Sequence, residues 1–212
     1  MKLPAFLRFL EPRVQKPIDG LGMRGHIRVE RTAGGIVELV HDSPNFIVDA
    51  GLEAVADLLI GSNGGGFEGS IFRMAVGDGG SVPGDILNPK LPDATWPGRT
   101  GLFHEILRKD INTFTRPTAN SMRFQANFNP FGLVDASGYS LADKVVNEAS
   151  LIIGDGVLTV GDDPRQINKT SPDSVDGDEV MLSMRTFRSA SFDEAEDVTI
   201  TITWTITVAK AA

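Results

Sequence analysis

The sequence predicts a mainly β fold, a β-sandwich or jelly-roll-like domain with one short α-helix at about residues 50–61. Three observations predict it: strict apolar–threonine alternation over residues 198–208, strand signals in several shorter segments, and a single stretch with helical spacing. Many short strands with one helix favour two packed sheets. The 212 residues suit one such domain, so we expect residues 25–212 to form it behind an N-terminal arm of residues 1–24.

The first 24 residues differ in composition from the rest of the chain. They contain three prolines, and their apolar residues are not spaced for a helix of any length. Five basic and two acidic residues give them a charge of +3, which leaves −11 for the remainder of a chain whose total is −8. We interpret them as an extended arm that packs on a partner, with a terminus without fixed structure as the alternative. The acidic body repels phosphate backbones, so we expect it to bind no nucleic acid.

Strand signals begin directly after the arm. Residues 26–31 alternate between apolar and polar side chains, Gly34-Gly35 favours a turn, and residues 36–40 return as a second strand. This arrangement indicates a β-hairpin. Residues 45–48 are a further short β candidate.

One segment, residues 49–61, has the pattern of an amphipathic helix. Asp49 is a suitable N-cap, and Gly61 is a plausible terminator. Its apolar residues recur at i, i+3, i+4 and i+7 and are Leu52, Val55, Ala56 and Leu59. A helix with one apolar face is expected to lie against a sheet.

The middle of the chain alternates between strand candidates and turn-rich segments. Residues 71–76, 102–111 and 121–128 are strand candidates, and so are residues 145–153, with a helix as an open alternative for these. Residues 81–100 contain four prolines and no periodicity. A loop of this length is uncommon in a compact domain and often contacts a partner.

Residues 198–208 carry the clearest signal in the sequence. Apolar residues, five of them β-branched and one Trp204, occupy every even position, and threonine occupies every odd position between them. This pattern predicts a long strand with one face in the core. An unpaired strand of this length promotes aggregation, so we place it near the centre of a sheet.

Motifs that would carry chemistry are weak. Gly20-x-Gly22-x-x-Gly25 formally matches a dinucleotide fingerprint, but Pro17 precedes it and a strand pattern follows, so we interpret it as a hinge between arm and body. The chain has no cysteine, and its three histidines, His26, His41 and His104, are far apart in sequence, which favours surface or edge positions.

A calcium site is a weak alternative to solvated turn carboxylates. The candidate ligands are Asp173, Asp176, Asp178 and Glu179. A looser acidic group consists of Asp155, Asp162 and Asp163. Neither group has EF-hand spacing, and no G-x-S-x-G elbow is present. We therefore expect a non-enzymatic protein with no catalytic residue, no cofactor and no small-molecule substrate.

Several segments, taken in order, resemble a type of tailed-bacteriophage virion protein found among collar, neck, baseplate and tail-fibre components. The segments are Asn45-Phe-Ile-Val-Asp-Ala-Gly51, Ala56-Asp-Leu-Leu-Ile-Gly61, Met74-Ala-Val-Gly-Asp-Gly-Gly80, Leu102-Phe-His-Glu-Ile-Leu-Arg108, Asn147-Glu-Ala-Ser-Leu-Ile152, Met181-Leu-Ser-Met-Arg-Thr-Phe187 and Ile200-Thr-Ile-Thr-Trp-Thr-Ile206. The chain departs from the usual pattern at Glu148-Ala-Ser-Leu151, where the family has glycine in place of Ser150, and in its long loop at residues 81–100.

The resemblance implies a structural subunit of the virion, made in the host bacterial cytoplasm, that contacts other virion proteins and forms a homo-oligomer or ring. A head decoration protein and a carbohydrate- or receptor-binding β-sandwich are the alternatives. No apolar stretch has the length of a membrane helix, so we expect no membrane partner. The residues that we expect at partner contacts are Phe6, Leu7, Phe9, Leu10, Leu91, Trp96 and Phe103.

Overall fold

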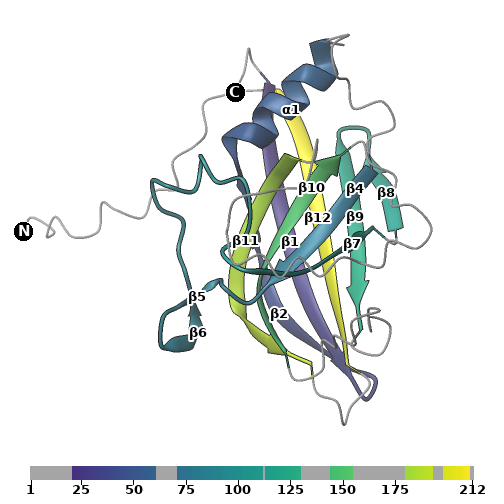
Figure 1. Cartoon of the computed structure of the whole chain (residues 1–212). Helices are drawn as coiled ribbons and strands as arrows, with labels where there is room; N and C mark the ends of the chain where they lie inside the picture. The colour runs from purple at the N-terminus through teal and green to yellow at the C-terminus, as the bar shows by residue number, and fades with distance from the viewer. Residues whose placement is uncertain are drawn as a thin grey trace, which may run out of the picture.

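The computed structural model describes residues 21–60, 71–111, 113–129, 144–154, 180–192 and 198–210. These residues form a mainly β protein with a single short helix, as the sequence predicts. Figure 1 shows the two large sheets layered on each other, with the helix α1 across one end and a small hairpin set apart from them.

The first sheet has five antiparallel strands, of which β12 is the central one. Its strands in spatial order are β2 (Ile36–Pro44), β1 (Leu21–Ala33), β12 (Thr199–Lys210), β9 (Ser121–Phe128) and β8 (Thr113–Thr118). β12 pairs with β1 on one side and with β9 on the other. The prediction that the alternating segment lies near the centre of a sheet is therefore confirmed.

The second sheet also has five antiparallel strands. They are, in spatial order, β3 (Phe46–Ile47), β11 (Val180–Ser191), β10 (Val145–Gly154), β4 (Ile71–Gly77) and β7 (Glu105–Asp110). Residues 145–153 are thus in a strand, and the alternative of a helix is wrong. A two-stranded hairpin of β5 (Ser81–Val82) and β6 (Asp85–Pro89) completes the described strands.

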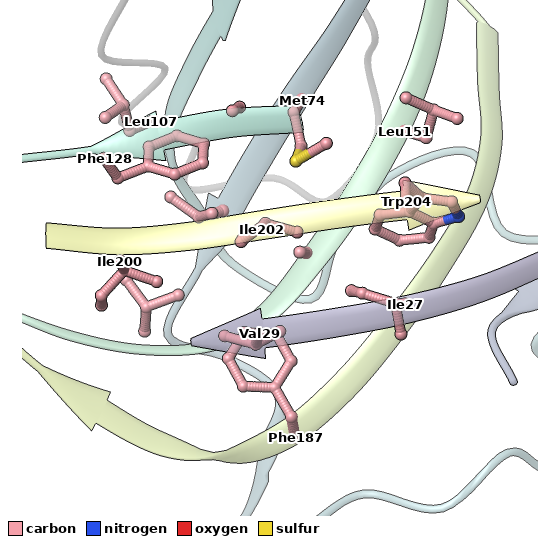
Figure 2. Close-up of a cluster of buried hydrophobic side chains, with 14 of the residues drawn as sticks. Ile27, Val29, Met74, Leu107, Phe128, Leu151, Phe187, Ile200, Ile202 and Trp204 are labelled. Carbon is pink, nitrogen blue, oxygen red and sulfur yellow. The ribbon is translucent and has the colours of Figure 1, made fainter. Parts of the chain in front are cut away.

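The core lies between the two five-stranded sheets. Ile200, Ile202 and Trp204 of β12 are fully buried, whereas the threonines between them are partly exposed. Figure 2 shows them with Met74 and Leu151 from the opposite sheet. The alternation in the sequence therefore separates a face in the core from a face near solvent.

Two local features follow directly from the sequence. Gly34 and Gly35 join β1 to β2 with positive φ angles of 54° and 78°, which is the geometry of a tight hairpin turn. The helix α1 (Asp49–Ile60) lies against β11, as expected for a helix with one apolar face. A Cβ on Gly51 would come within 2.3 Å of the carbonyl oxygen of Leu182, so glycine at this position permits the close approach.

The boundary of the domain differs from the predicted one. β1 begins at Leu21 rather than after residue 24, and Gly22 and Gly25 lie inside this strand, so the glycine motif is not a hinge. Cross-strand pairing with β12 over residues 21–25 explains why this stretch is not part of an arm. Residues 1–20, with the predicted contacts Phe6, Leu7, Phe9 and Leu10, lie outside the described part of the chain.

Candidate interaction surface

The hairpin of β5 and β6 presents apolar side chains to solvent. Ile86 and Leu87 on β6 are exposed, and Val82 on β5 and Leu91 just beyond β6 are exposed as well. Figure 1 places this hairpin beside the sheets rather than within either of them. Gly84 makes its turn with a φ of 82°. We call residues 81–91 the apolar hairpin.

Asn147 of β10 holds the first residues of the apolar hairpin. Its Oδ1 accepts a hydrogen bond of 2.7 Å from the backbone N–H of Gly80, and its Nδ2 donates one of 2.8 Å to Oγ of Ser81. Lys90 closes the other end, because its backbone N–H donates to the carbonyl of Gly80 and its ammonium group donates to the carbonyl of Gly79. The two ends of the hairpin are thus tied to each other and to the sheet.

Glu148, the next residue of β10, is fully buried and binds three backbone N–H groups. Its Oε1 accepts hydrogen bonds of 2.7 Å from His104 and 3.1 Å from Gly79, and its Oε2 accepts one of 2.9 Å from Phe103. These donors lie on both sides of the apolar hairpin in sequence. A single carboxylate therefore joins the segment that enters the hairpin to the segment that leads into β7.

Burial raises the pKa of Glu148 to about 7, although the three N–H donors and the nearby Arg99 guanidinium favour the ionised form. A buried carboxylate loses its hydration, and this cost exceeds what the hydrogen bonds return. The side chain therefore changes its protonation state close to neutral pH.

The pairing of β10 with β11 has a register shift between Val146 and Glu148. The polar side chains of Asn147 and Glu148 are both buried at this point. On a regular strand, neighbouring side chains point to opposite faces, and a bulge changes this relation. Asn147 and Glu148 are both buried and both point to the loop that follows β4. The register shift thus allows both side chains to reach this loop, and we call Asn147 and Glu148 the anchor.

The glycines of the loop after β4 permit this close packing. A Cβ on Gly77 would lie 2.2 Å from the carbonyl oxygen of His104, and one on Gly80 would lie 2.4 Å from the carbonyl oxygen of Asn147. A Cβ on Gly79 would lie 2.6 Å from the backbone nitrogen of His104. Distances this short exclude any side chain unless the backbone moves.

Two cations contact the ring of Phe103 at the base of the apolar hairpin. The Lys90 ammonium and the Arg99 guanidinium are each 3.8 Å from the centroid of its ring. Trp96 packs edge-on against Phe103 and Phe46, with ring centroids 6.0 and 5.8 Å away. Cation–π contacts and aromatic packing both stabilise such an arrangement.

The predicted partner contacts within the described residues therefore have different positions. Leu91 is 68% exposed and available at the surface. Phe103 is half-buried under its two cations. Trp96 is fully buried, so the prediction that it contacts a partner is at odds with the structure: its ring fills a small core of its own chain.

β11 supports the apolar hairpin from the side. Oγ of Ser189 donates to the carbonyl of Ile86, and Oγ1 of Thr186 donates to the carbonyl of Lys90, each over 2.5 Å. β11 also contacts β2 of the other large sheet, where Arg188 forms an ion pair with Glu38. Ile36, Val37 and Leu39 of β2 are exposed apolar residues, and we call them the β2 strip.

A buried ion pair lies in β7. Nε and one terminal nitrogen of Arg108 each bind a carboxylate oxygen of Glu105 over 2.8 Å. The two side chains are almost fully buried, and the pair spans a register shift beside Gly77. In the segment Leu102–Arg108, which has the pattern L-x-x-E-x-x-R, Glu105 and Arg108 thus form a structural ion pair.

Each of the three histidines has a different polar partner. His26 lies beside Asp42 at 3.0 Å, and His104 forms an ion pair with Asp78. His41 is half-buried, and its Nε2 and Oγ of Ser43 are hydrogen-bonded over 2.7 Å. The centroid of its ring lies 6.0 Å from that of Phe187. Burial lowers the pKa of His41 to about 4, and the nearby Arg185 guanidinium lowers it further.

Across the described ranges, no group of three or more histidine, aspartate or glutamate residues is arranged to hold a metal ion. The calcium candidates Asp173, Asp176, Asp178 and Glu179 lie outside these ranges, as do Asp155, Asp162 and Asp163. Nor does any helix in the described part of the chain have the length and apolar character needed to cross a membrane.

The anchor formed by Asn147 and Glu148 is the part of the site that the sequence analysis did not assign. A signal was present, because an amide and a carboxylate lie next to each other in a strand whose other residues, apart from Ser150, are apolar or glycine. Two such polar residues in a buried strand need partners. The partners themselves are not readable from the sequence, since they lie 44 to 69 residues away.

The fold and the surface define the chain as a β-sandwich domain with an anchored apolar hairpin at its side. Comparisons of the chain with protein-family models, with curated proteins and with solved structures gave no match.

Proposed function

We propose that the chain is a non-enzymatic structural subunit of a tailed-bacteriophage virion, in the collar, neck, baseplate or fibre-attachment region. It acts through contacts with other virion proteins and is located in the particle after synthesis in the host cytoplasm. The observation that carries the proposal is the apolar hairpin, which exposes Ile86, Leu87 and Leu91 while its base is fixed by Asn147 and Glu148.

The energetic cost of such a surface supports a role in assembly. Apolar side chains in water are unfavourable, and contiguous exposed apolar surface commonly marks a site of association. A hairpin that is already fixed loses little conformational entropy when a partner covers it. An exposed apolar hairpin held by a buried polar network therefore suits a permanent contact between subunits.

Three of the segments that carry the family resemblance meet at the base of the hairpin. Hydrogen bonds join Asn147 and Glu148 to the glycine segment at Gly79 and Gly80. They also join Glu148 to Phe103 and His104, near the start of the L-x-x-E-x-x-R segment. Their common use in one anchor gives a physical reason for their occurrence together in one chain. This convergence supports the proposal without depending on any single motif.

The test is the position of the chain on the particle. Gold-labelled antibodies against the folded chain should bind intact particles of the phage that encodes it, at the neck, baseplate or fibre attachment. Label spread over the capsid would favour a head decoration protein. Absence of the chain from purified particles by mass spectrometry, with the chain abundant in the lysate, would contradict the proposal.

A complementation assay tests the role of the hairpin. A phage that lacks the gene is supplied with the wild-type chain or with Ile86→Ser, Leu87→Ser and Leu91→Ser combined. We expect the triple variant to fold but to restore few infectious particles, because its contact surface is polar. Phe114→Ser is the matched control, since Phe114 is also an exposed apolar residue but lies on β8, in a different sheet from the hairpin and from β11, which supports it.

A further inference from the structure

In the described part of the chain, six buried side-chain atoms lack a hydrogen-bond partner, and five of them belong to only four residues. These five are Oδ1 and Nδ2 of Asn45, Oγ of Ser183, Nε of Arg185 and Nε1 of Trp204. The sixth, Nε1 of Trp96, lies in the separate small core. A buried polar group without a partner is costly and rare, so several of them in one place indicate a binding site.

The pairing of the strands places two of these residues, Ser183 and Arg185 of β11, between the two large sheets. Ser183 pairs with Leu151 and Arg185 pairs with Ala149, and both partners belong to the hydrophobic core. Residues that pair across antiparallel strands project from the same face of a sheet. Ser183 and Arg185 therefore face the inside of the sandwich, two positions apart along one strand.

Asn45, which lies between β2 and β3, reaches the same region. The pairing of β3 with β11, continued by one residue, places Asn45 opposite Arg185. A Cβ on Gly25 of β1 would overlap with the amide of Asn45, so this amide fills the space of a side chain at residue 25. Ile27, the next residue of β1 on that face, pairs with Trp204. Asn45 therefore adjoins β11 on one side and the strands around Trp204 on the other.

Arg185 brings a positive charge to this region. Burial lowers the pKa of its guanidinium, and among the described residues no carboxylate forms an ion pair with it. His41 on β2 faces it, since its ring packs on Phe187 of β11 and Arg185 helps to lower its pKa to about 4. His41 is therefore uncharged near neutral pH. Because Arg185 and His41 are partly exposed and β2 is an edge strand, the guanidinium is accessible from the edge of the sandwich.

The free polar atoms match a small planar anion. Nε–H of Arg185, Nε1–H of Trp204 and the amide N–H groups of Asn45 are donors, and the hydroxyl of Ser183 can donate as well. Nε and a terminal nitrogen of a guanidinium form a planar fork that fits the two oxygens of a carboxylate. Packed sheets lie about 10 Å apart, so only a small ion can lie between them.

We propose that Asn45, Ser183 and Arg185 bind a small carboxylate ion, of the size of formate or acetate, between the two sheets, with Trp204 as a further donor. The ion is a structural ligand that undergoes no reaction. It neutralises the guanidinium and accepts hydrogen bonds from the buried donors, so it stabilises the contact of β11 with the segment that joins β2 to β3. This binding goes beyond the proposed function and does not depend on the place of the chain in a particle.

The indole N–H signals of the two tryptophans test the proposal in the wild-type chain. Both Nε1 atoms are buried without a partner, but only Trp204 belongs to the proposed site. In nitrogen–proton correlation spectra near neutral pH, sodium acetate should shift the Trp204 signal along a saturable curve and leave the Trp96 signal in place. Sodium chloride at the same ionic strength should shift neither. A Trp204 signal that does not respond to acetate, or responds equally to chloride, would overturn the proposal.

Thermal unfolding of arginine variants gives a second test, because a ligand that binds only the folded state raises Tm. Arg185→Met removes the charge and the fork but keeps an apolar side chain, and it should weaken acetate binding by about tenfold or more. Arg188→Met, at an exposed position of the same strand, is the matched control and should keep the acetate-dependent rise in Tm. An equal rise in both variants would contradict the proposed site. If Arg185→Met does not fold, the tryptophan signals of the wild type still decide.

Discussion

Oε2 of Glu148 accepts a hydrogen bond of 2.9 Å from the backbone N–H of Phe103, a residue 45 positions earlier in the chain. The same carboxylate binds the N–H groups of Gly79 and His104. Because the side chain is fully buried, water cannot replace it as the acceptor. The geometry of the whole segment between β4 and β7 therefore depends on one side chain of β10.

Removal of this carboxylate should be strongly destabilising. Glu148→Ala leaves three buried N–H groups without an acceptor, and each such group costs about 1–3 kcal/mol, so we expect a loss of about 3 kcal/mol or more in the free energy of unfolding. Glu148→Gln, which keeps one acceptor oxygen, should lose less. Urea denaturation measures both, with Glu53→Ala on the exposed face of α1 as the control. Equal stability of Glu148→Ala and the control would refute the anchoring role.

The raised pKa of Glu148 predicts a pH dependence of stability. The folded state holds the proton up to about pH 7, whereas the unfolded state releases it near the ordinary value of 4.5. The stabilising contribution is therefore fully present below pH 4.5 and is lost as the pH rises to about 7. We expect the difference in unfolding free energy between the wild type and Glu148→Gln to change across this window and to be flat above it.

His41 predicts the opposite slope over nearly the same window. Its pKa falls from 6.5 to about 4 in the folded state, so its contribution is present above pH 6.5 and is lost as the pH falls through 4. His41→Asn should remove this slope, and His26→Asn, at an exposed position, should not. In the wild type the two effects partly cancel, and each variant should reveal the slope of the other group.

Substitution by alanine should cost much more stability at one position of β12 than at the adjacent one. Ile202 is fully buried in the core, so Ile202→Ala should cost about 2–5 kcal/mol. Thr203 is partly exposed on the other face of the strand, and Thr203→Ala should stay within about 1 kcal/mol. Thermal or chemical unfolding of the two variants gives the comparison. Similar losses would mean that the alternation does not divide core from surface.

Substitution by alanine should cost different amounts of stability at two glycines, one in the apolar hairpin and one next to it. Gly84 has a positive φ but open space around it, so Gly84→Ala should cost about 1–2 kcal/mol of backbone strain. At Gly80, a Cβ would lie 2.4 Å from the carbonyl oxygen of Asn147 and 2.8 Å from Cβ of Glu148. Gly80→Ala must displace the anchor and should be the more destabilising of the two. A smaller loss for Gly80→Ala would contradict the close packing at the anchor.

The strands that the sequence predicts are those with a clear periodicity or a clear boundary. β9 lies at the predicted residues 121–128, and β12 follows the apolar–threonine alternation. β8 carries no such signal, because all six of its side chains are exposed and it contains Pro117. β11 is buried along most of its length on both faces, so its apolar residues show no alternation.

The anchor could be predicted only in part. The presence of Asn147 and Glu148 in an apolar strand indicates that polar partners exist. Which backbone groups they bind depends on the register shift in β10 and on the pairing of β4 with β10 and β7. These relations join distant parts of the chain and leave no local trace in the sequence. The burial of Trp96 is of the same kind, because Phe46 reaches it from another element.

The place of β12 between β1 and β9 has a consequence for folding. Leu21 pairs with Lys210 and Ala33 with Ile36, so one neighbour of β1 follows it directly in sequence and the other lies far along the chain. Until β12 pairs with them, β1 and β9 have no strand between them, and their apolar side chains stay exposed to water. Pairings so distant along the chain slow folding. The closing of this sheet by β12 should therefore be a slow step in folding.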